Sequence, residues 1–232
     1  MRFGIIGAME GEISQLKSLM EIDNQRKIGG MMFKQGLLEG IKTVLVQSGI
    51  GKVNGALCAH ILINVYRVDC VIFTGVAGAL LAQLDIGDIV ISADSMYHDV
   101  DVTDFGYPLG QIPRLPVRAF PAEPRLIELA RETAERKLKR RVIVGRVLTG
   151  DRFIADKAEA QKLGTELAGV CVEMEGAGVG QACYMNKIPY VLIRCISDKA
   201  DGTAPSDFNL FSQQAADCAA EIVCGILRNY TG

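Results

Sequence analysis

Short apolar runs separated by glycine-rich or polar turns recur along the chain, and they predict the strands of a buried sheet. Between them lie stretches with helical spacing of apolar residues, which are typical of helices packed on a sheet. This alternation predicts an α/β fold in one domain over residues 1–232. The expected strands cover residues 2–8, 32–38, 41–47, 70–74, 88–93, 142–148 and 190–196, and the expected helices cover residues 10–20, 53–66, 123–140 and 207–227.

A further apolar run, Val170-Cys171-Val172, leads into Glu173, Met174 and Glu175 before a glycine- and alanine-rich helical stretch. It predicts a buried strand that presents side chains at its carboxyl end, where open α/β sheets bind ligands. In an extended segment the two glutamates share one face and Met174 faces the other way. A carboxylate and a thioether suit a ribose and a flat ring, although two solvated acids explain the stretch equally well.

Composition and charge argue against several classes of protein. Hydrophobic residues make up 49% of the 232 residues and the formal net charge is −2, which gives no basic surface for nucleic acid. No apolar run approaches the ~18 residues of a membrane span, and the N-terminus lacks a signal-peptide cleavage site. The seven cysteines show no C-x-x-C pairing, so we expect reduced thiols in a cytoplasmic protein. We expect neither a metal site nor another cofactor.

Candidate ligand-binding side chains follow several of the predicted strands. None of these stretches has the glycine pattern of a dinucleotide site or a P-loop. Taken singly, each has a structural explanation: Glu12 as a first-turn helix acid, Asp198 as a helix cap, and Phe153 and Met174 as core residues. The irregular, proline-rich residues 99–120 predict a functional or interfacial loop. The candidates are Met9, Glu12, Ile50, Gly75–Gly78, Phe153, Ile154, Glu173–Glu175, Arg194, Ser197 and Asp198.

Motifs along nearly the whole chain resemble those of the 5′-methylthioadenosine/S-adenosylhomocysteine nucleosidases, within the nucleoside phosphorylase/hydrolase fold. The resemblance implies a three-layer fold in which helices flank a central mixed β-sheet. Its specificity comes from the number of matches at consistent spacing. The matching residues are Gly4–Glu10 with Glu12, Ser48–Val53, Thr74-Gly75-x-Ala77-Gly78, Gly87–Val90, Tyr97–Asp99, Asp101–Thr103, Phe105–Tyr107, Gly150-Asp151-x-Phe153-Ile154, Val172–Glu175 and Arg194-x-Ile196-Ser197-Asp198.

The family pattern implies a role for each matching residue. Glu12 corresponds to the carboxylate that activates water, and Asp198 to the acid that donates to adenine N7. Glu175 corresponds to the carboxylate that holds the ribose hydroxyls, and Ser197 to the residue that positions the aspartic acid. The remaining matches are Gly78, Phe153, Ile154 and Met174 around the nucleoside, Met9, Ile50 and Phe208 around the 5′-alkylthio group, and Val102, Phe105, Tyr107 and Pro113 in the partner subunit's pocket of a homodimer.

The chemistry of N-glycosidic cleavage fits these residue types. Protonating adenine at N7 improves the leaving group, and it requires Asp198 to carry a proton near neutral pH. Carboxylates at Glu12 and Glu175 place negative charge near the cationic sugar of the transition state, and Glu12 can accept the proton of water. An acid and a base on opposite sides of the bond follow the logic of glycoside hydrolysis. The expected substrates are methylthioadenosine, S-adenosylhomocysteine and 5′-deoxyadenosine.

Val76 departs from the family pattern, which has a serine there to help seat the nucleophilic water. In its absence we expect the water to depend on Glu12, Arg194 or backbone groups. The closest alternative function is a phosphate-dependent purine nucleoside or methylthioadenosine phosphorylase. Because Phe73 and Val76 occupy the positions of that enzyme's phosphate-binding arginine and serine, and Glu12 would repel phosphate, hydrolysis is favoured. A nucleoside-binding protein without activity is the other alternative.

Overall fold

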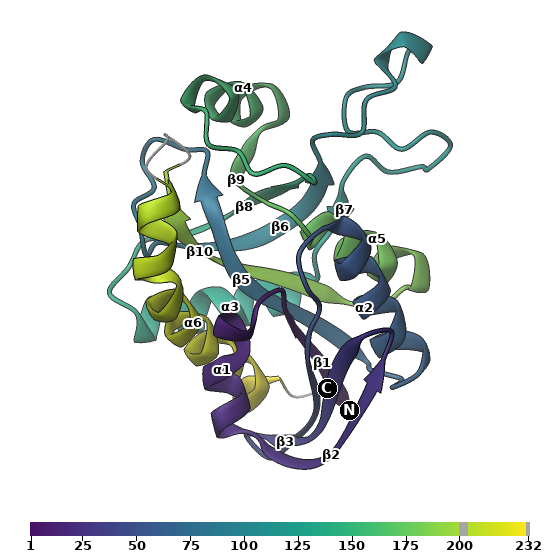
Figure 1. The fold of residues 1–232 in the computed structure, drawn as a ribbon, viewed down its shortest axis with the longest axis vertical. Coiled ribbons are helices and arrows are strands. Elements are labelled where there is room, and N and C mark those ends of the chain that lie inside the picture. Colours follow the sequence, from purple (N-terminus) through teal and green to yellow (C-terminus); the bar gives the residue numbers. More distant parts are fainter. Residues whose placement is uncertain (200–203, 231–232) are drawn as a thin grey trace.

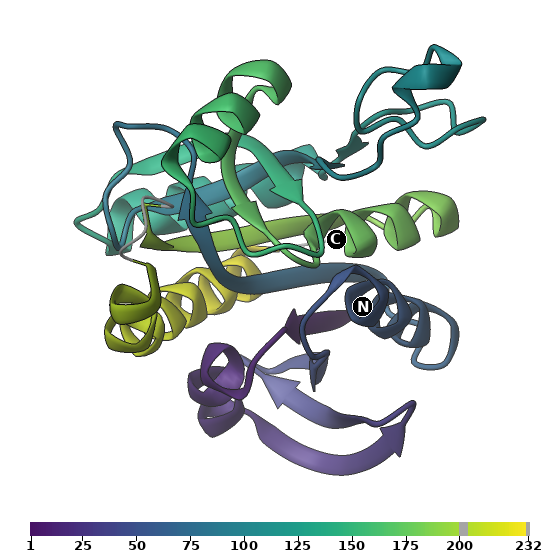
Figure 2. The same cartoon turned by 45° about the horizontal axis from the view of Figure 1, so that its top comes forward.

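The computed structural model of the chain describes residues 1–199 and 204–230, with the side chains of residues 204–216 left out. Within these residues ten strands form one mixed sheet with helices on both faces (Figures 1 and 2), which confirms the predicted fold class. The strands are β1 (Arg2–Gly7), β2 (Glu21–Ile28), β3 (Met31–Leu38), β4 (Ile41–Gln47), β5 (Cys70–Ala79), β6 (Ile89–Tyr97), β7 (Phe120–Pro121), β8 (Val142–Thr149), β9 (Gly169–Glu173) and β10 (Tyr190–Asp198). The helices are α1 (Glu10–Leu19), α2 (Lys52–Asn64), the 3₁₀ turn η1 (Thr103–Phe105), α3 (Pro124–Lys137), α4 (Lys157–Leu167), α5 (Gly176–Asn186) and α6 (Ala204–Asn229).

Strand pairing brings distant parts of the chain to one point at the end of β5. Parallel β1 and β10 flank the first part of β5. Strands β10, β6, β8, β9 and β5 then pair in turn, and because β5 also pairs with β10 they close into a ring. Near the end of β5, Gly78 lies opposite Asp198 of β10 on one side and Val172 of β9 on the other. The carboxyl ends of β5, β9 and β10 are therefore neighbours.

The sheet buries apolar side chains on both faces. Helices α2 and α5 cover one face, where Leu62 and Val179 belong to a single buried cluster. Helices α1, α3 and α6 cover the other, where Leu16, Ala130 and Ile222 are buried together. Burial at about 25 cal/mol per Å² of apolar surface makes these two clusters the main favourable contribution to folding.

Besides the short elements β7 and η1 near the irregular segment, two elements were not expected from the sequence. The edge strand β2 (Glu-Ile-Asp-Asn-Gln-Arg-Lys-Ile) has almost no buried side chain, so it carries no apolar signal and forms by pairing with β3. Helix α4 was also missed. Two expected strands are longer than predicted: β5 continues through the glycine motif to Ala79, and β6 to Tyr97, because each keeps pairing with neighbours beyond its apolar run.

Residues 99–120 are largely irregular, as expected, and include the short turn η1. This segment extends away from the rest of the fold, as the teal arm at the upper right of Figures 1 and 2 shows. Phe105 in η1 is 81% exposed.

None of the helices in the described ranges, 1–199 and 204–230, combines the length and apolar character of a membrane span.

Helices α2 and α5 approach each other through glycines. A Cβ on Gly178 of α5 would lie 2.5 Å from the carbonyl oxygen of Lys52 at the start of α2. A Cβ on Gly55 of α2 would lie 3.0 Å from the carbonyl oxygen of Glu175. No side chain fits either gap without displacing backbone, so these glycines set the distance between the two helix N-termini.

The Gly178→Ala substitution should therefore separate α2 from α5 and destabilise the fold by about 1–3 kcal/mol, the usual effect of overpacking. Thermal unfolding should show a Tm several degrees lower. Gly11→Ala in α1 is the matched control, because a Cβ there meets nothing within 4 Å, and it should leave Tm unchanged or raised. Equal Tm changes in the two variants would show that helix contact is not the cause.

Candidate active site

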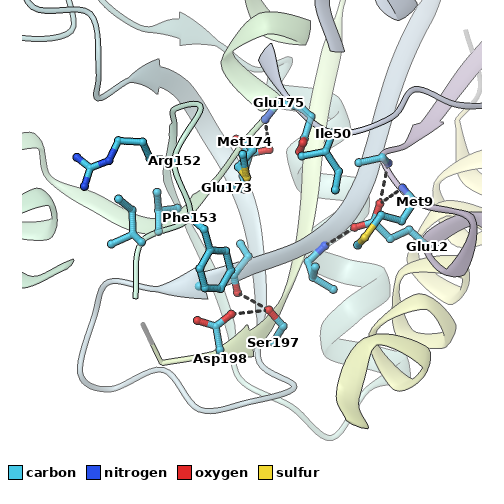
Figure 3. Close-up of a pocket in the computed structure, with 16 residues that line it drawn as sticks. Met9, Glu12, Ile50, Arg152, Phe153, Glu173, Met174, Glu175, Ser197 and Asp198 are labelled. Carbon is cyan, nitrogen blue, oxygen red and sulfur yellow. Dashed lines mark hydrogen bonds between the residues drawn. The ribbon is translucent and has the colours of Figure 1, made fainter. Parts of the chain in front are cut away.

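A cavity of about 380 Å³ opens where β1, β5, β9 and β10 end (Figure 3). It collects side chains from segments that lie far apart in the sequence. The lining includes ten of the predicted catalytic and binding residues: Met9, Glu12, Ile50, Gly78, Phe153, Ile154, Met174, Glu175, Ser197 and Asp198. The side chain of Phe208 lies outside the described residues, and Arg194 lies behind the lining.

Glu12 is held by backbone groups on both carboxylate oxygens. It is the third residue of α1, and its Oε2 accepts hydrogen bonds from the N–H groups of Ala8 (2.6 Å) and Met9 (2.9 Å), as in a capping box. Its Oε1 accepts from the Val76 N–H at 3.0 Å. Glu12 therefore caps its own helix and also faces the cavity, so both explanations considered for it apply. Burial raises the pKa of Glu12, and Arg194 and these N–H groups oppose that rise.

Val76, which stands where the family pattern has a water-seating serine, contacts Glu12 through its backbone. The Val76 backbone, rather than its side chain, supplies the third hydrogen bond to the carboxylate. Gly75 beside it leaves the necessary room, since a Cβ there would lie 2.6 Å from Glu12 Oε1. The valine side chain contributes only apolar surface to the cavity.

Asp198 ends β10 and is 2% exposed. The Ser197 hydroxyl donates to its Oδ2 at 2.8 Å and also lies 3.4 Å from the carbonyl oxygen of Ala77. A register irregularity in β10 between Ile196 and Asp198 places both neighbouring side chains, Ser197 and Asp198, at the cavity. Figure 3 shows Asp198 at one side of the cavity, below Phe153, and Glu12 at the other.

Glu175 faces the glycine-rich turn before α2. Its Oε1 accepts a hydrogen bond of 2.8 Å from the Gly51 N–H. Burial, followed by the charge of Glu173, raises the pKa of Glu175 to about 8. The close approach of α2 and α5 thus places a buried carboxylate that titrates near neutral pH on the cavity wall.

The expected arrangement of Glu173 and Glu175 on one face of a strand is wrong. Strand β9 ends at Glu173, and the chain bends at Met174 before α5 begins, so all three residues border the cavity. Glu173 accepts hydrogen bonds from the N–H groups of Glu175 and Gly176 and pairs with Arg194. An anion at a helix N-terminus is stabilising, and the bend places the Glu173 carboxylate there.

Arg194 is buried and held away from the open cavity. Its Nη2 donates to Glu173 Oε2 at 2.7 Å, and its Nη1 lies 3.2 Å from the carbonyl oxygen of Phe73. The guanidinium carbon stacks 4.0 Å from the centroid of the Phe73 ring. A Cβ on Gly75 would lie 3.3 Å from Nη1, so the guanidinium approaches Glu12 from behind that glycine.

Lys52 joins three loops at the rim of the site. Its ammonium forms ion pairs with Asp99 at 2.6 Å and Asp151 at 3.6 Å. The Asp151 side chain also accepts from the Lys52 N–H at 2.9 Å. The turn that contacts Glu175 is thereby linked to the loop that carries Phe153.

Apolar surface covers the rest of the cavity. Phe153 is 54% exposed and stands over the space between Met174 and Asp198 in Figure 3. Met9 and Ile50 lie at the opposite end. This arrangement suits a flat heterocycle at one end and an apolar substituent at the other. The predicted residues Val102, Phe105, Tyr107 and Pro113 do not line the cavity of their own chain.

Among the described residues, no group of three or more His, Cys, Asp or Glu side chains is placed to hold a metal ion. The carboxylates of the cavity are instead satisfied by backbone N–H groups, a serine and an arginine.

Residues 2–228 match the model of the phosphorylase superfamily, and the chain belongs to this superfamily.

Among its relatives, the 5′-methylthioadenosine/S-adenosylhomocysteine nucleosidase of Geobacillus kaustophilus is 41% identical over 98% of this chain and 97% of its own. A crystal structure of the nucleosidase of that name from Neisseria meningitidis, in complex with methylthio-immucillin-A, superposes with a TM-score of 0.94 at 38% identity over 99% of both chains. The chain therefore belongs to this nucleosidase family. The futalosine hydrolase of Helicobacter pylori is similar too, with a TM-score of 0.93 at 32% identity over 99% of this chain and 98% of that one.

The raised pKa of Glu175 predicts a specific pH dependence of stability. The folded protein binds the Glu175 proton up to about pH 8, whereas the unfolded chain releases it near the ordinary glutamate value. Between those values the folded state holds more protons, so the contribution of this group to the free energy of unfolding falls as pH rises.

Urea unfolding of the native protein and of Glu175→Gln between pH 5 and 9 should reveal this contribution of Glu175 to the free energy of unfolding. The native protein should lose stability relative to the variant as pH rises, and the difference should level off above about pH 8. The exposed Glu166→Gln serves as the control and should show no such trend. A stability difference between native protein and E175Q that is constant over this range would contradict the assignment.

Proposed function

We propose that the protein hydrolyses the N-glycosidic bond of 5′-methylthioadenosine and S-adenosylhomocysteine, releasing adenine and the 5-substituted ribose. The observation that carries the proposal is the placement of Glu12 and Asp198 on opposite sides of one cavity. A bound nucleoside would lie between them, with its base beneath Phe153 and its ribose hydroxyls at Glu175. Such an enzyme serves methionine salvage and the recycling of products formed from S-adenosylmethionine.

The reaction follows from these positions. Asp198 donates a proton to adenine N7, so that the bond from C1′ to N9 breaks with its electron pair on a neutral base. The carboxylate of Glu12 stabilises the positive charge that develops on the sugar. Glu175, which holds a proton up to about pH 8 in the substrate-free protein, forms hydrogen bonds with the ribose hydroxyls. Glu12 Oε1 takes a proton from water while the water oxygen bonds to C1′. One water is consumed, and one adenine and one 5-substituted ribose are formed.

Hydrolysis is favoured over phosphorolysis by the charges around the nucleophile's position. Phosphate binding needs cations or free helix N–H donors. Arg194 is already paired with Glu173 and with backbone carbonyls, and Phe73 is buried beneath it. The N–H groups of Ala8, Met9 and Val76 all donate to Glu12. A phosphate there would meet a carboxylate rather than donors.

The 5′ end of the cavity supports substrates with apolar tails. Met9 and Ile50 offer apolar surface to a methylthio group, and 5′-deoxyadenosine would leave part of that space unfilled. The similarity to a futalosine hydrolase makes aminodeoxyfutalosine a further candidate, because it shares the adenine and the ribose. An open mouth for longer tails would depend on residues 199–211, of which residues 200–203 and the side chains of 204–211 lie outside the described residues.

We also propose a homodimer in which the projecting arm completes the partner's cavity. Phe105 is 81% exposed on that arm and lies outside its own cavity, and Val102, Tyr107 and Pro113 belong to the same segment. Ile50 and Val53, at the start of α2, are 54% and 68% exposed, so the mouth of the cavity carries apolar surface that such an arm could cover. A cytoplasmic location fits the seven cysteines, all of which are free thiols.

Adenine release from methylthioadenosine in phosphate-free buffer tests the proposed reaction. We expect turnover without phosphate and no change on its addition. Release only in the presence of phosphate, with a ribose 1-phosphate as product, would assign the protein to the phosphorylases. Binding in a calorimeter without turnover would make it a nucleoside-binding protein.

Asp198→Asn should abolish adenine release, with a loss of about 10²-fold or more in kcat, because asparagine cannot donate the proton to N7. Binding of methylthioadenosine should be largely kept, since the amide fills the same space. Asp23→Asn on the exposed edge strand β2 is the matched control and should retain full activity. Turnover by D198N near the native rate would remove Asp198 as the acid.

Phe105→Ala should raise KM for methylthioadenosine about tenfold, equivalent to about 1.4 kcal/mol of binding free energy, with a smaller effect on kcat. Mixing F105A subunits with D198N subunits provides the decisive control. A mixed dimer contains one site with Asp198 from one chain and Phe105 from the other, so half of its sites should recover the native KM. No recovery in a mixture shown by ultracentrifugation to contain dimers would place Phe105 outside the partner's site.

A further inference from the structure

Glu173 has no role in the family pattern described above, although it is the most heavily hydrogen-bonded carboxylate among the described residues. Its two oxygens accept from the Thr149 hydroxyl (2.5 Å), the Gly176 N–H (2.8 and 2.9 Å), the Glu175 N–H (3.2 Å) and Arg194 Nη2 (2.7 Å). Its side chain is 3% exposed. All its acceptor capacity is used within the protein, so it is not available to a substrate.

Arg194 depends on Glu173 for its charge balance. The two side chains are 1% and 3% exposed, so the ion pair is almost completely removed from water. The other contacts of the guanidinium are neutral: the carbonyl oxygens of Phe73 and Ile193 and the Phe73 ring. Without Glu173 a buried cation would lose its only paired anion among the described residues, which is costly in a medium of low dielectric constant.

Arg194 in turn acts on Glu12. A Cβ at Gly75 would be 3.3 Å from Arg194 Nη1 and 2.6 Å from Glu12 Oε1, so the two groups share the space behind that glycine. The charge of Arg194 lowers the pKa of Glu12 against the effect of burial, whereas Glu173 does not act on Glu12 directly. Arg194, which pairs with Glu173 and lies beside Glu12, is therefore the main link between the two carboxylates, and Glu175, which interacts with both, is the second.

We propose that Glu173 is a positioning residue for the reaction. It fixes the Arg194 guanidinium behind Gly75 and offsets its charge, so that Glu12 remains basic enough to take the proton of water. The same carboxylate holds the N-terminus of α5, where Glu175 faces the ribose. This inference rests on the proposed function.

Several charged groups surround Glu12, and each can affect its titration. From β10 it is faced by Arg194 and, across the cavity, Asp198; from the start of α5 by Glu175; and the exit loop of β8 contributes Arg152. On its own helix, Glu10 is half exposed and paired with Lys17. Substitution at residue 173 also removes the charge that helps to raise the pKa of Glu175. The titration of Glu12 is therefore also compared in an E175Q background, where its response reports the Glu173–Arg194 pair.

Glu173→Gln removes the charge and keeps the size. The uncompensated Arg194 should make Glu12 easier to ionise, so the acidic limb of the pH profile of kcat/KM should move to lower pH by about one unit. As a weaker base, Glu12 should also give a kcat lower by on the order of tenfold at pH 7. Glu173→Asp keeps the charge but shortens the side chain, so kcat should fall while the acidic limb stays at the native pH.

A double-substitution cycle tests whether Glu173 influences Glu12 through Arg194. In an Arg194→Gln background, E173Q should cause no further displacement of the acidic limb, because the charge that it releases is absent. The proposal would be overturned if the acidic limb of E173Q stayed at the native pH or moved to higher pH. It would also be overturned if E173D showed the same displacement as E173Q, or if the displacement caused by E173Q persisted in the R194Q background. Should E173Q fail to fold, native kcat in E173D would overturn it by itself.

Titration of Glu12 by NMR in the substrate-free protein, with ¹³C-labelled glutamate assigned through Glu12→Gln, separates this inference from the proposed function. The Glu12 signal should titrate at lower pH in E173Q than in the native protein, whatever the enzyme's substrate. An unchanged titration would reject the role of Glu173 even if the protein is a nucleosidase. A displaced titration in a protein that releases no adenine would reject only the proposed reaction.

Discussion

The burial of like charges is the constraint on which this site depends. Glu12, Glu173 and Glu175 are each at most 7% exposed, and Arg194 is their shared cation. Three carboxylates beside one guanidinium would be prohibitive in an apolar interior. The fold compensates with backbone N–H groups at the starts of α1 and α5 and in the turn before α2. Helix N-termini and strand ends have such donors to spare, which is why the cluster lies where they converge.

The three carboxylates differ in how many of their hydrogen-bond acceptor positions these donors occupy. Glu173 has all its acceptor positions occupied and serves the structure. Glu12 has three backbone donors and Glu175 has the Gly51 N–H, so both keep acceptor capacity toward the cavity. Burial raises the pKa values of Glu12 and Glu175, and their few hydrogen bonds offset this rise only in part. Groups that remain expensive to ionise are those that can respond to a cationic sugar or a proton.

The sequence predicted most of the fold because its buried strands are short apolar runs ending in glycine or acidic residues. It missed β2, whose side chains are almost all exposed and whose existence depends on pairing with β3. The candidates at the ends of β1, β5 and β10 were brought together as expected, since these strands are parallel. Those after β9 join them because β9 pairs antiparallel with the end of β5. The sequence could not predict that Glu173 binds Arg194 and the N-terminus of α5 while Glu175 keeps acceptor capacity toward the cavity. This difference depends on the bend at Met174, just before α5 begins.

The valine at position 76 shows why a departure from a family pattern need not remove the chemistry. A hydroxyl at that position would add one hydrogen bond near the carboxylate, worth about 1 kcal/mol. The Val76 N–H, the capping geometry of α1 and the charge of Arg194 act on Glu12 independently of that side chain. Because the base is oriented by the backbone, substitution at residue 76 changes the surroundings of the water more than the position of Glu12. Rate and substrate preference are therefore the properties that should vary there, while the hydrolytic arrangement is kept.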